Sequence, residues 1–225
     1  MRLLVLIVAI VLPSFSQSWG FFAHRKINRL AVFTLPPEMI IFYKQNIQYT
    51  NKGLDWFNVS GGQKYSSYDD RIAADFSSAT FAVCAAAITG NELLITGLDF
   101  EDYQGDKAVF GYLEKMGLEV RHTDEGVWVK GGNLKGVELD VNDTPDALPA
   151  LAAAACYAKG KTVLGNVKQA RLKECDRIAA MATELTKMGA KIEELPDGLI
   201  IEGGPLQGAK LHGYHDHRMV MALSL

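Results

Sequence analysis

The sequence predicts an α/β fold in which β-α-β-α-β-β modules of about 70 residues repeat within one domain. Three observations predict it. Similar stretches recur about seventy residues apart, each stretch alternates helical periodicity with short β-branched runs, and the matching landmarks keep the same order. A repeated unit sets the whole architecture, because each copy buries its apolar face against its neighbour.

The first part of each module is an Ala-rich helix that ends at a glycine. SSATFAVCAAAITG (Ser77–Gly90) aligns with PDALPALAAAACYAKG (Pro145–Gly160), so that Ala147 follows Ala79 by 68 residues. Glycine is a frequent helix terminator. A short strand follows each helix, LLITGL in the first module and TVLGNV in the second. These runs have the composition of strands.

The second part of each module is an amphipathic helix that ends in KMG, followed by a β-hairpin. The matching stretches that contain this helix are Gly105–Val120 and Cys175–Ile192. The hairpins are DEGVWVKGG (Asp124–Gly132) and PDGLIIEGG (Pro196–Gly204), and their terminal glycine pairs lie 72 residues apart. A third helix start, DHRMVMALSL, follows, and its Asp216 lies 70 residues after Asp146. Because the chain stops at Leu225, we expect the third module to be truncated.

The first residues have a different character. Met1-Arg2 precede the apolar run Leu3–Pro13, and the small residues Ser16 and Ser18 follow. A positive start, an apolar run too short to span a bilayer and small residues are typical of a secretory signal. We therefore predict a signal-peptide-like segment at 1–18, a short helical segment at 19–53 and a partial C-terminal α/β domain at 54–225.

The segment after the signal-like run predicts two short helices broken at Pro36-Pro37. Trp19, followed by His24, resembles the mature N-terminus of secreted zinc hydrolases of the phospholipase C and S1/P1 nuclease group. In that group the terminal Trp amine and the following His bind zinc. The four other histidines of this chain all lie in the α/β part, so no zinc site is complete. We interpret the chain as a fusion of unrelated fragments.

Charge and cysteine content exclude several classes of function. The net charge is −3, from 23 basic and 26 acidic residues, so we expect no nucleic-acid partner and no membrane partner beyond the signal-like segment. Any anionic ligand must be held by a local cluster of charges. The 3 cysteines show no CxxC spacing, which argues against a disulfide framework and a zinc ribbon. This composition indicates a cytoplasmic α/β part, whereas the signal-like segment would direct export.

Three places carry chemistry-bearing side chains. Asp146 opens an Ala-rich helix, where a carboxylate is also a common N-terminal cap. If RLKECDR is helical, Lys173 and Arg177 are four residues apart and repel unless an anion lies between them. Glu174 could instead form a surface pair with Arg177. The matching stretch of the first module, FEDYQGDKA, lacks this charge density, so folding of the module does not require it.

The third place is YHDHRM, which opens the last helix. An Arg at a helix N-terminus is unfavourable unless it meets an anion, so Arg218 indicates anion binding. Two histidines flanking Asp216 could suggest a metal. Such closely spaced residues at a helix start rarely converge on one ion, so we expect no metal.

Six motifs together resemble a known family. GGQKY, DFSSATF, QGD, PDA, RLKECDR and DHRM occur in this order over about 170 residues. They resemble the landmarks of the shikimate-pathway enolpyruvyl transferases, the 3-phosphoshikimate 1-carboxyvinyltransferase (EPSP synthase) family. Cys175 departs from the pattern, because the family usually has Ser or Thr there. The resemblance implies an enolpyruvyl-transferase-type domain that acts as a monomer without metal or organic cofactor.

The resemblance also implies a reaction and roles for residues. The family transfers the enolpyruvyl group from phosphoenolpyruvate to the 5-hydroxyl of shikimate 3-phosphate. By resemblance, Asp146 is the general base and Glu174 handles the methylene proton. The implied substrate-binding residues carry cationic or hydrogen-bonding side chains: Gln169 and Lys173 for shikimate 3-phosphate, and Arg177, His217 and Arg218 for phosphoenolpyruvate.

The family's other domain supplies a Lys, an Arg and a Ser-Ser-Gln set, and a final Lys lies near the family's C-terminus. None has a counterpart in this sequence, so we expect an incomplete fragment without activity. Two alternatives stay open. One is the related transferase that acts on UDP-N-acetylglucosamine, and the other is a secreted zinc-dependent hydrolase defined by the N-terminal segment.

Overall fold

The computed structural model describes residues 47–48, 58–59 and 74–225. The signal-like segment and the helices predicted within 19–53 lie outside the described residues. Two short strands, β1 (Ile47–Gln48) and β2 (Asn58–Val59), pair antiparallel. Their pairing joins the two sides of the boundary predicted at residue 54. None of the helices in the described part of the chain is long and apolar enough to cross a membrane.

The first module contains the predicted elements in the predicted order: α4 (Phe76–Thr89), β3 (Glu92–Ile95), the short 3-10 helix η1 (Gly105–Lys107), α5 (Ala108–Met116), β4 (Glu119–Thr123) and β5 (Gly126–Lys130). The strands form an antiparallel sheet in the order β3-β5-β4. Alternate residues of β5 are buried, with Val127 and Val129 facing the helices. This is the period-2 pattern of a sheet with one covered face.

The second module repeats this arrangement: β6 (Glu138–Asp140), α6 (Leu148–Ala155), β7 (Lys161–Gly165), the 3-10 helix η2 (Lys168–Leu172), α7 (Arg177–Lys187), β8 (Lys191–Leu195) and β9 (Gly198–Glu202). Its sheet order is β6-β7-β9-β8, so β7-β9-β8 corresponds to β3-β5-β4. β6 is the first strand of the module and pairs parallel with β7. The last helix, α8 (His217–Leu223), begins where the third copy was predicted.

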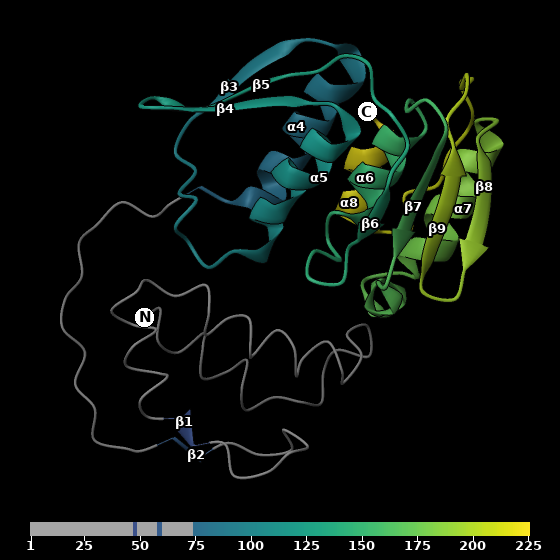
Figure 1. Cartoon of the computed structure of the whole chain (residues 1–225). Coiled ribbons are helices and arrows are strands. Elements are labelled where there is room, and N and C mark those ends of the chain that lie inside the picture. The colour runs from purple at the N-terminus through teal and green to yellow at the C-terminus, as the bar shows by residue number, and fades with distance from the viewer. Residues whose placement is uncertain (1–46, 49–57, 60–73) are drawn as a thin grey trace.

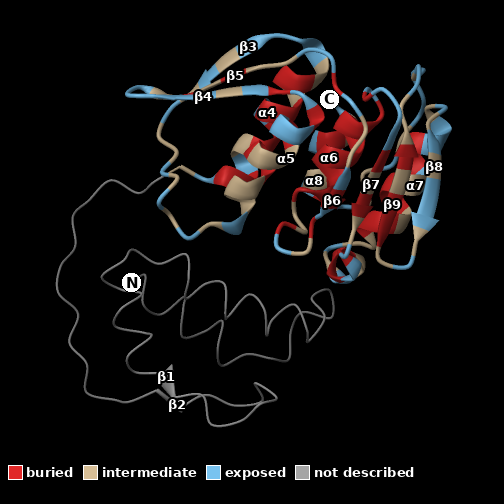
Figure 2. Cartoon of the chain, in the orientation of Figure 1, coloured by how far each residue is buried: buried red, intermediate tan, exposed pale blue. Residues whose placement is uncertain are grey.

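The helices lie between the two sheets. Helices α4 and α5 cover one sheet, α6 and α7 cover the other, and α4 packs against α6 (Figure 1). The buried residues therefore gather in the helical layer and on the inner faces of the strands (Figure 2). Every residue of α6 is buried, because it lies between α4, α7 and α8. Its Ala-rich sequence lets these neighbours approach closely.

The first glycine of each repeated GG pair has a steric reason. A Cβ on Gly131 would lie 1.9 Å from the carbonyl oxygen of Ala86 in α4. A Cβ on Gly203 would lie 1.7 Å from the carbonyl oxygen of Ala158, just after α6. Each hairpin thus ends against the backbone in or just after its module's Ala-rich helix, and only glycine fits this approach. The sequence repeat is therefore a repeat of the same contact.

Candidate active site

Arg177 is the centre of an ion-pair cluster at the N-termini of α6, α7 and α8. It is the first residue of α7, and its side chain is only 1% exposed. Nε and Nη2 donate to the two carboxylate oxygens of Asp216 at 2.8 and 3.3 Å, and Nη1 donates to Asp146 at 2.7 Å. Nη2 also donates to Glu174 at 2.7 Å. A buried guanidinium needs such partners, because an unpaired charge would carry a large desolvation cost.

The RLKECDR segment is not a continuous helix, which corrects the premise that Lys173 and Arg177 share one. The 3-10 helix η2 ends at Leu172, Lys173 is extended with φ −89° and ψ −155°, and α7 begins at Arg177. The carboxylate of Asp176 caps the N-terminus of α7 by accepting from the backbone N–H of Ala179 at 3.0 Å. The segment therefore turns, and this turn brings both cations to the same carboxylate.

Asp146 is that carboxylate. Lys173 Nζ lies 2.9 Å from Asp146 Oδ1, and Arg218 Nη2 lies 3.7 Å from Oδ2. Asp146 does not cap α6, because that helix begins at Leu148 and has no side-chain cap. Burial alone would raise the pKa of the Asp146 carboxyl, but the nearby Lys173, Arg218 and Arg177 outweigh it and hold the pKa below its usual value. Asp146 is therefore an ionised acceptor shared by three cations.

Asp216 joins the cluster to α8. Its buried carboxylate caps α8 by accepting from the backbone N–H of Arg218 at 2.8 Å. Burial would raise its pKa, yet the hydrogen bonds and charge of Arg177 lower it overall. The Arg218 side chain at this helix start lies beside Asp146, so in this structure its charge is balanced by a carboxylate of the protein itself. His217 projects outward, with 64% of its side chain exposed and Nδ1 4.0 Å from Asp216.

Cys175, the departure from the family pattern, also contacts Asp216. Its thiol donates to Asp216 Oδ2 at 3.6 Å. Burial, reinforced by the neighbouring carboxylate, raises the pKa of the thiol to about 12, so it stays protonated and keeps its hydrogen for this bond. A Ser or Thr hydroxyl at this position could donate to the same oxygen.

The structure brings together five of the seven residues singled out from the sequence: Asp146, Lys173, Glu174, Arg177 and Arg218. Gln169 lies on η2, and its Nε2 donates to the backbone oxygen of Asn142 at 2.6 Å. Its hydrogen bonds therefore support the loop that leads to Asp146 rather than the ion pairs themselves. His217 contributes an exposed imidazole at the edge of the cluster.

Sequence reasoning missed two carboxylates of the site. Asp216 was visible in the DHRM motif but was not expected to be the buried partner of Arg177. Asp106, in the QGD motif, lies on η1, and the adjacent Gly105 approaches the loop before Asp146, since its Cβ would lie 3.0 Å from the Asp143 oxygen. Burial and the negative charge of Asp146 raise the pKa of Asp106 to about 6. The motif itself was the signal that could have found it.

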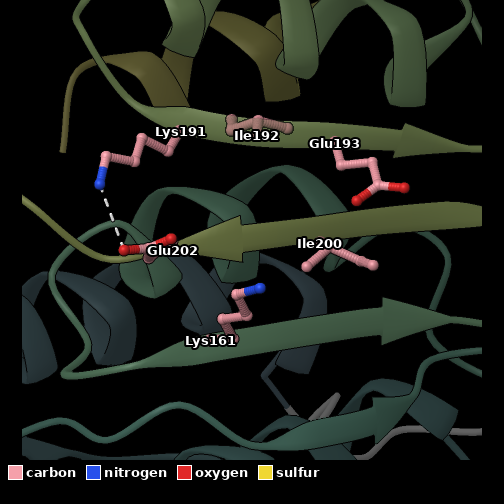
Figure 3. A pocket seen from close by; sticks show the side chains of 6 residues that line it. All are labelled: Lys161, Lys191, Ile192, Glu193, Ile200 and Glu202. Carbon is pink, nitrogen blue, oxygen red and sulfur yellow. Dashed lines mark hydrogen bonds and ion pairs between the residues drawn. The ribbon is translucent and has the colours of Figure 1, made fainter.

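A surface cavity lies elsewhere, on the strands of the second module. It measures about 240 Å³ and is lined by side chains of β7, β8 and β9, including Lys161, Lys191 and Glu202 (Figure 3). Lys191 and Glu202 are already paired at 3.2 Å. No residue of the ion-pair cluster lines this cavity. Within residues 74–225 and the two short strands, no group of three or more His, Cys, Asp or Glu could hold a metal ion.

The comparison with known families identifies the family of the chain. The sequence model of the EPSP synthase family, described as EPSP synthase (3-phosphoshikimate 1-carboxyvinyltransferase), matches residues 38–225. The chain belongs to the EPSP synthase family. The match begins at residue 38, ahead of the boundary predicted at residue 54, and it leaves residues 1–37 outside the family region.

Similar proteins carry the family's name. A 3-phosphoshikimate 1-carboxyvinyltransferase of Ruminiclostridium cellulolyticum is 53% identical over 182 residues, which is 81% of this chain and 43% of the relative. One from Methanococcus aeolicus is 43% identical over 183 residues, 80% of this chain and 42% of the relative. A solved EPSP synthase structure from Acinetobacter baumannii superposes with a TM-score of 0.66 at 26% identity, covering 94% of this chain and 48% of that one. The chain thus spans less than half the length of the curated EPSP synthase relatives it matches.

Proposed function

We propose that this chain carries one part of an active site that transfers the enolpyruvyl group of phosphoenolpyruvate to the 5-hydroxyl of shikimate 3-phosphate. The observation that carries the proposal is the cluster of Asp146, Glu174 and Arg177 with two further cations at three helix N-termini. Helix N-termini favour anions, and both substrates are anionic. Family membership supplies the reaction.

Lys173 and Arg218 are partly exposed, so each could release the Asp146 carboxylate and bind a substrate anion in its place. The side chains of Lys173 and Arg218 are 22% and 15% exposed. We propose that Lys173, with Gln169, contacts shikimate 3-phosphate and that Arg218 contacts phosphoenolpyruvate with the exposed His217. Arg177 is assigned to phosphoenolpyruvate by resemblance as well. Because it is buried among three carboxylates, it would have to exchange one of them to reach the ligand.

The same exchange would activate Asp146 as a base. In this structure its lowered pKa makes it a weak proton acceptor, because Lys173 and Arg218 stabilise the ionised form. A substrate phosphate or carboxylate that draws these cations away would raise the pKa and strengthen the base toward the 5-hydroxyl. Glu174 stays oriented by Arg177 at 2.7 Å and is the group proposed to handle the methylene proton.

Binding to the full chain tests the proposal. We expect millimolar or weaker affinity for phosphoenolpyruvate, because the chain matches only 43% of the relative's length. Part of the charge-assisted contacts, each about 1.5 to 3 kcal/mol, is expected from the other domain. Arg218→Met should weaken binding about tenfold or more. The matched control is Lys191→Met, an exposed lysine away from the cluster. Equal affinity for both variants would contradict the proposal.

The acceptor is distinguished in the same experiment. Shikimate 3-phosphate should tighten phosphoenolpyruvate binding, since the two substrates are proposed to be neighbours on the cluster. UDP-N-acetylglucosamine should have no effect. If UDP-N-acetylglucosamine tightens phosphoenolpyruvate binding and shikimate 3-phosphate does not, the result would favour the related transferase that acts on UDP-N-acetylglucosamine. We further propose that this part of the chain acts in the cytoplasm as a monomer, a location that conflicts with the export signal proposed below for residues 1–18.

The N-terminal segments carry a separate proposal. We propose that residues 1–18 act as an export signal ahead of a segment that resembles a secreted zinc hydrolase. The family match begins at residue 38, so the proposed unrelated segment lies before that residue. Sequencing the N-terminus of the expressed chain tests this. A product that begins at Trp19 would support processing, and one that begins at Met1 would contradict it.

A further inference from the structure

A further buried carboxylate, this one on α7, lies outside the cluster and has no role in the proposed reaction. The Glu184 side chain is 0% exposed. Its Oε2 accepts from the backbone N–H of His212 at 2.9 Å, and its Oε1 accepts from the hydroxyl of Tyr214 at 2.8 Å. Lys187 Nζ donates to both oxygens at 2.7 and 2.9 Å and balances the charge. Glu184 therefore binds the segment that leads into α8.

Helix α7 holds this segment at two points. Arg177 and Glu184 are seven residues apart, two turns of one helix face. Arg177 binds Asp216, and Glu184 binds the residues immediately before it. The path of the backbone from His212 to Asp216 is consequently fixed against a single rigid helix.

The residues between these two points adopt an unusual conformation. Tyr214 and His215 have φ of 52° and 56°, in the left-handed region that side chains other than glycine rarely occupy. The backbone N–H of Tyr214 donates to His212 Nδ1 at 3.0 Å, and that of Asp216 donates to the Gly213 oxygen at 2.9 Å. Such a turn persists only when surrounding contacts hold it, and strained turns of this kind concentrate at functional sites.

We propose that Glu184 is a positioning residue: it holds the left-handed turn at Tyr214 and His215 so that Asp216 reaches Arg177 and caps α8. This places Arg218 beside Asp146. The expected effect of Glu184 on phosphoenolpyruvate binding rests on the proposed function. The effect on the conformation of the turn is independent of it.

Three variants of the full chain separate positioning from general stability. Tyr214→Phe removes one hydrogen bond with little change of volume. Glu184→Met removes both contacts to the turn. Glu184→Gln is the conservative rescue, because its amide oxygen can accept from the His212 N–H while its NH₂ donates to the Tyr214 hydroxyl. The Lys187 ammonium, whose side chain is 44% exposed, can turn away from the NH₂ into solvent. The matched control is Ile178→Val, which trims the buried face of the same helix without touching the turn.

Amide hydrogen exchange and chemical shifts in NMR spectra report on the turn. We expect Tyr214→Phe and Glu184→Met to lower protection at the Asp216 and Arg218 amides by about tenfold or more relative to amides in α4, equivalent to about 1.4 kcal/mol. Glu184→Gln should stay within about threefold of the parent chain. Ile178→Val should lower protection uniformly or not at all.

A titration with phosphoenolpyruvate, followed by NMR, then measures the effect of each variant on ligand binding. The shift changes at His217 and Arg218 should need a higher ligand concentration in Tyr214→Phe than in the parent chain or Ile178→Val. If the parent shows no shift changes with phosphoenolpyruvate, the proposed function fails while the exchange result still decides the role of Glu184. Unchanged protection at Asp216 and Arg218 in both Tyr214→Phe and Glu184→Met would overturn the positioning role, as would loss in Glu184→Gln equal to that in Glu184→Met.

Discussion

Replacing Asp106 with Asn should stabilise the folded chain at neutral and higher pH. Burial and the charge of Asp146 raise the pKa of Asp106 from 3.8 to about 6. Because the folded-state pKa lies above the unfolded value, folding favours the protonated form. The stability that Asp106 contributes is complete below its unfolded pKa and is lost as the pH rises through about 6. Asn is neutral at every pH and avoids this loss.

The magnitude follows from the size of the pKa change. A rise from 3.8 to about 6 is about two pKa units at about 1.4 kcal/mol each, which sets an upper limit of about 3 kcal/mol at pH 8. Asp106 is partly exposed, so solvent screening reduces this, and we expect a gain of about 1.5 kcal/mol. At pH 4.5 the gain should fall to about a third of that value.

Urea denaturation followed by circular dichroism at the two pH values measures the gain. The control is Asp124→Asn in the exposed β4–β5 turn, which should change stability by less than about 0.5 kcal/mol at either pH. In an Asp146→Asn background the Asp106→Asn gain should shrink, because the repelling charge is gone. A destabilised Asp106→Asn chain at pH 8, or a gain independent of pH, would refute the reasoning.

Three further predictions concern the same fold. Arg177→Met should lower the free energy of unfolding by about 3 to 5 kcal/mol, because it leaves the Asp216 carboxylate buried without its partner; a loss below about 1 kcal/mol in denaturant titration would contradict the ion-pair assignment. Gly203→Ala should be far more destabilising than Gly204→Ala in thermal denaturation, since only the first Cβ meets backbone; equal effects would argue against the close approach. Cys175→Ser should keep stability within about 1 kcal/mol, and a larger loss would show that the thiol is required.

Much of the fold could be predicted from the sequence because the second module repeats the first. The alternation of Ala-rich helix, strand, amphipathic helix and hairpin reappears in α4 to β5 and again in α6 to β9. Strand β6 was not located, because its three residues are too few to show a period. The boundary at residue 54 and the export signal stay predictions, since they fall on residues outside the described part of the chain.

The candidate site could be predicted only as a set of motifs. The charges of RLKECDR and DHRM pointed to anion binding, and the family resemblance named the residues. The sequence could not show which charged side chains form ion pairs with one another. Asp146 accepts from cations 27 and 31 residues away, and Glu184 accepts from residues 28 and 30 away. Such pairings depend on the packing of α6, α7 and α8, which no local pattern encodes.

Turnover of a chimera tests the central claim most directly. Residues 74–225 of this chain would replace the segment they match in the Ruminiclostridium cellulolyticum relative, and phosphate release from phosphoenolpyruvate and shikimate 3-phosphate would be measured. We expect release by the chimera, loss of at least about a hundredfold on Glu174→Gln or Asp146→Asn, and no release above background by the 225-residue chain alone. A folded chimera without turnover, or one unaffected by either substitution, would contradict the assignment of this cluster to enolpyruvyl transfer.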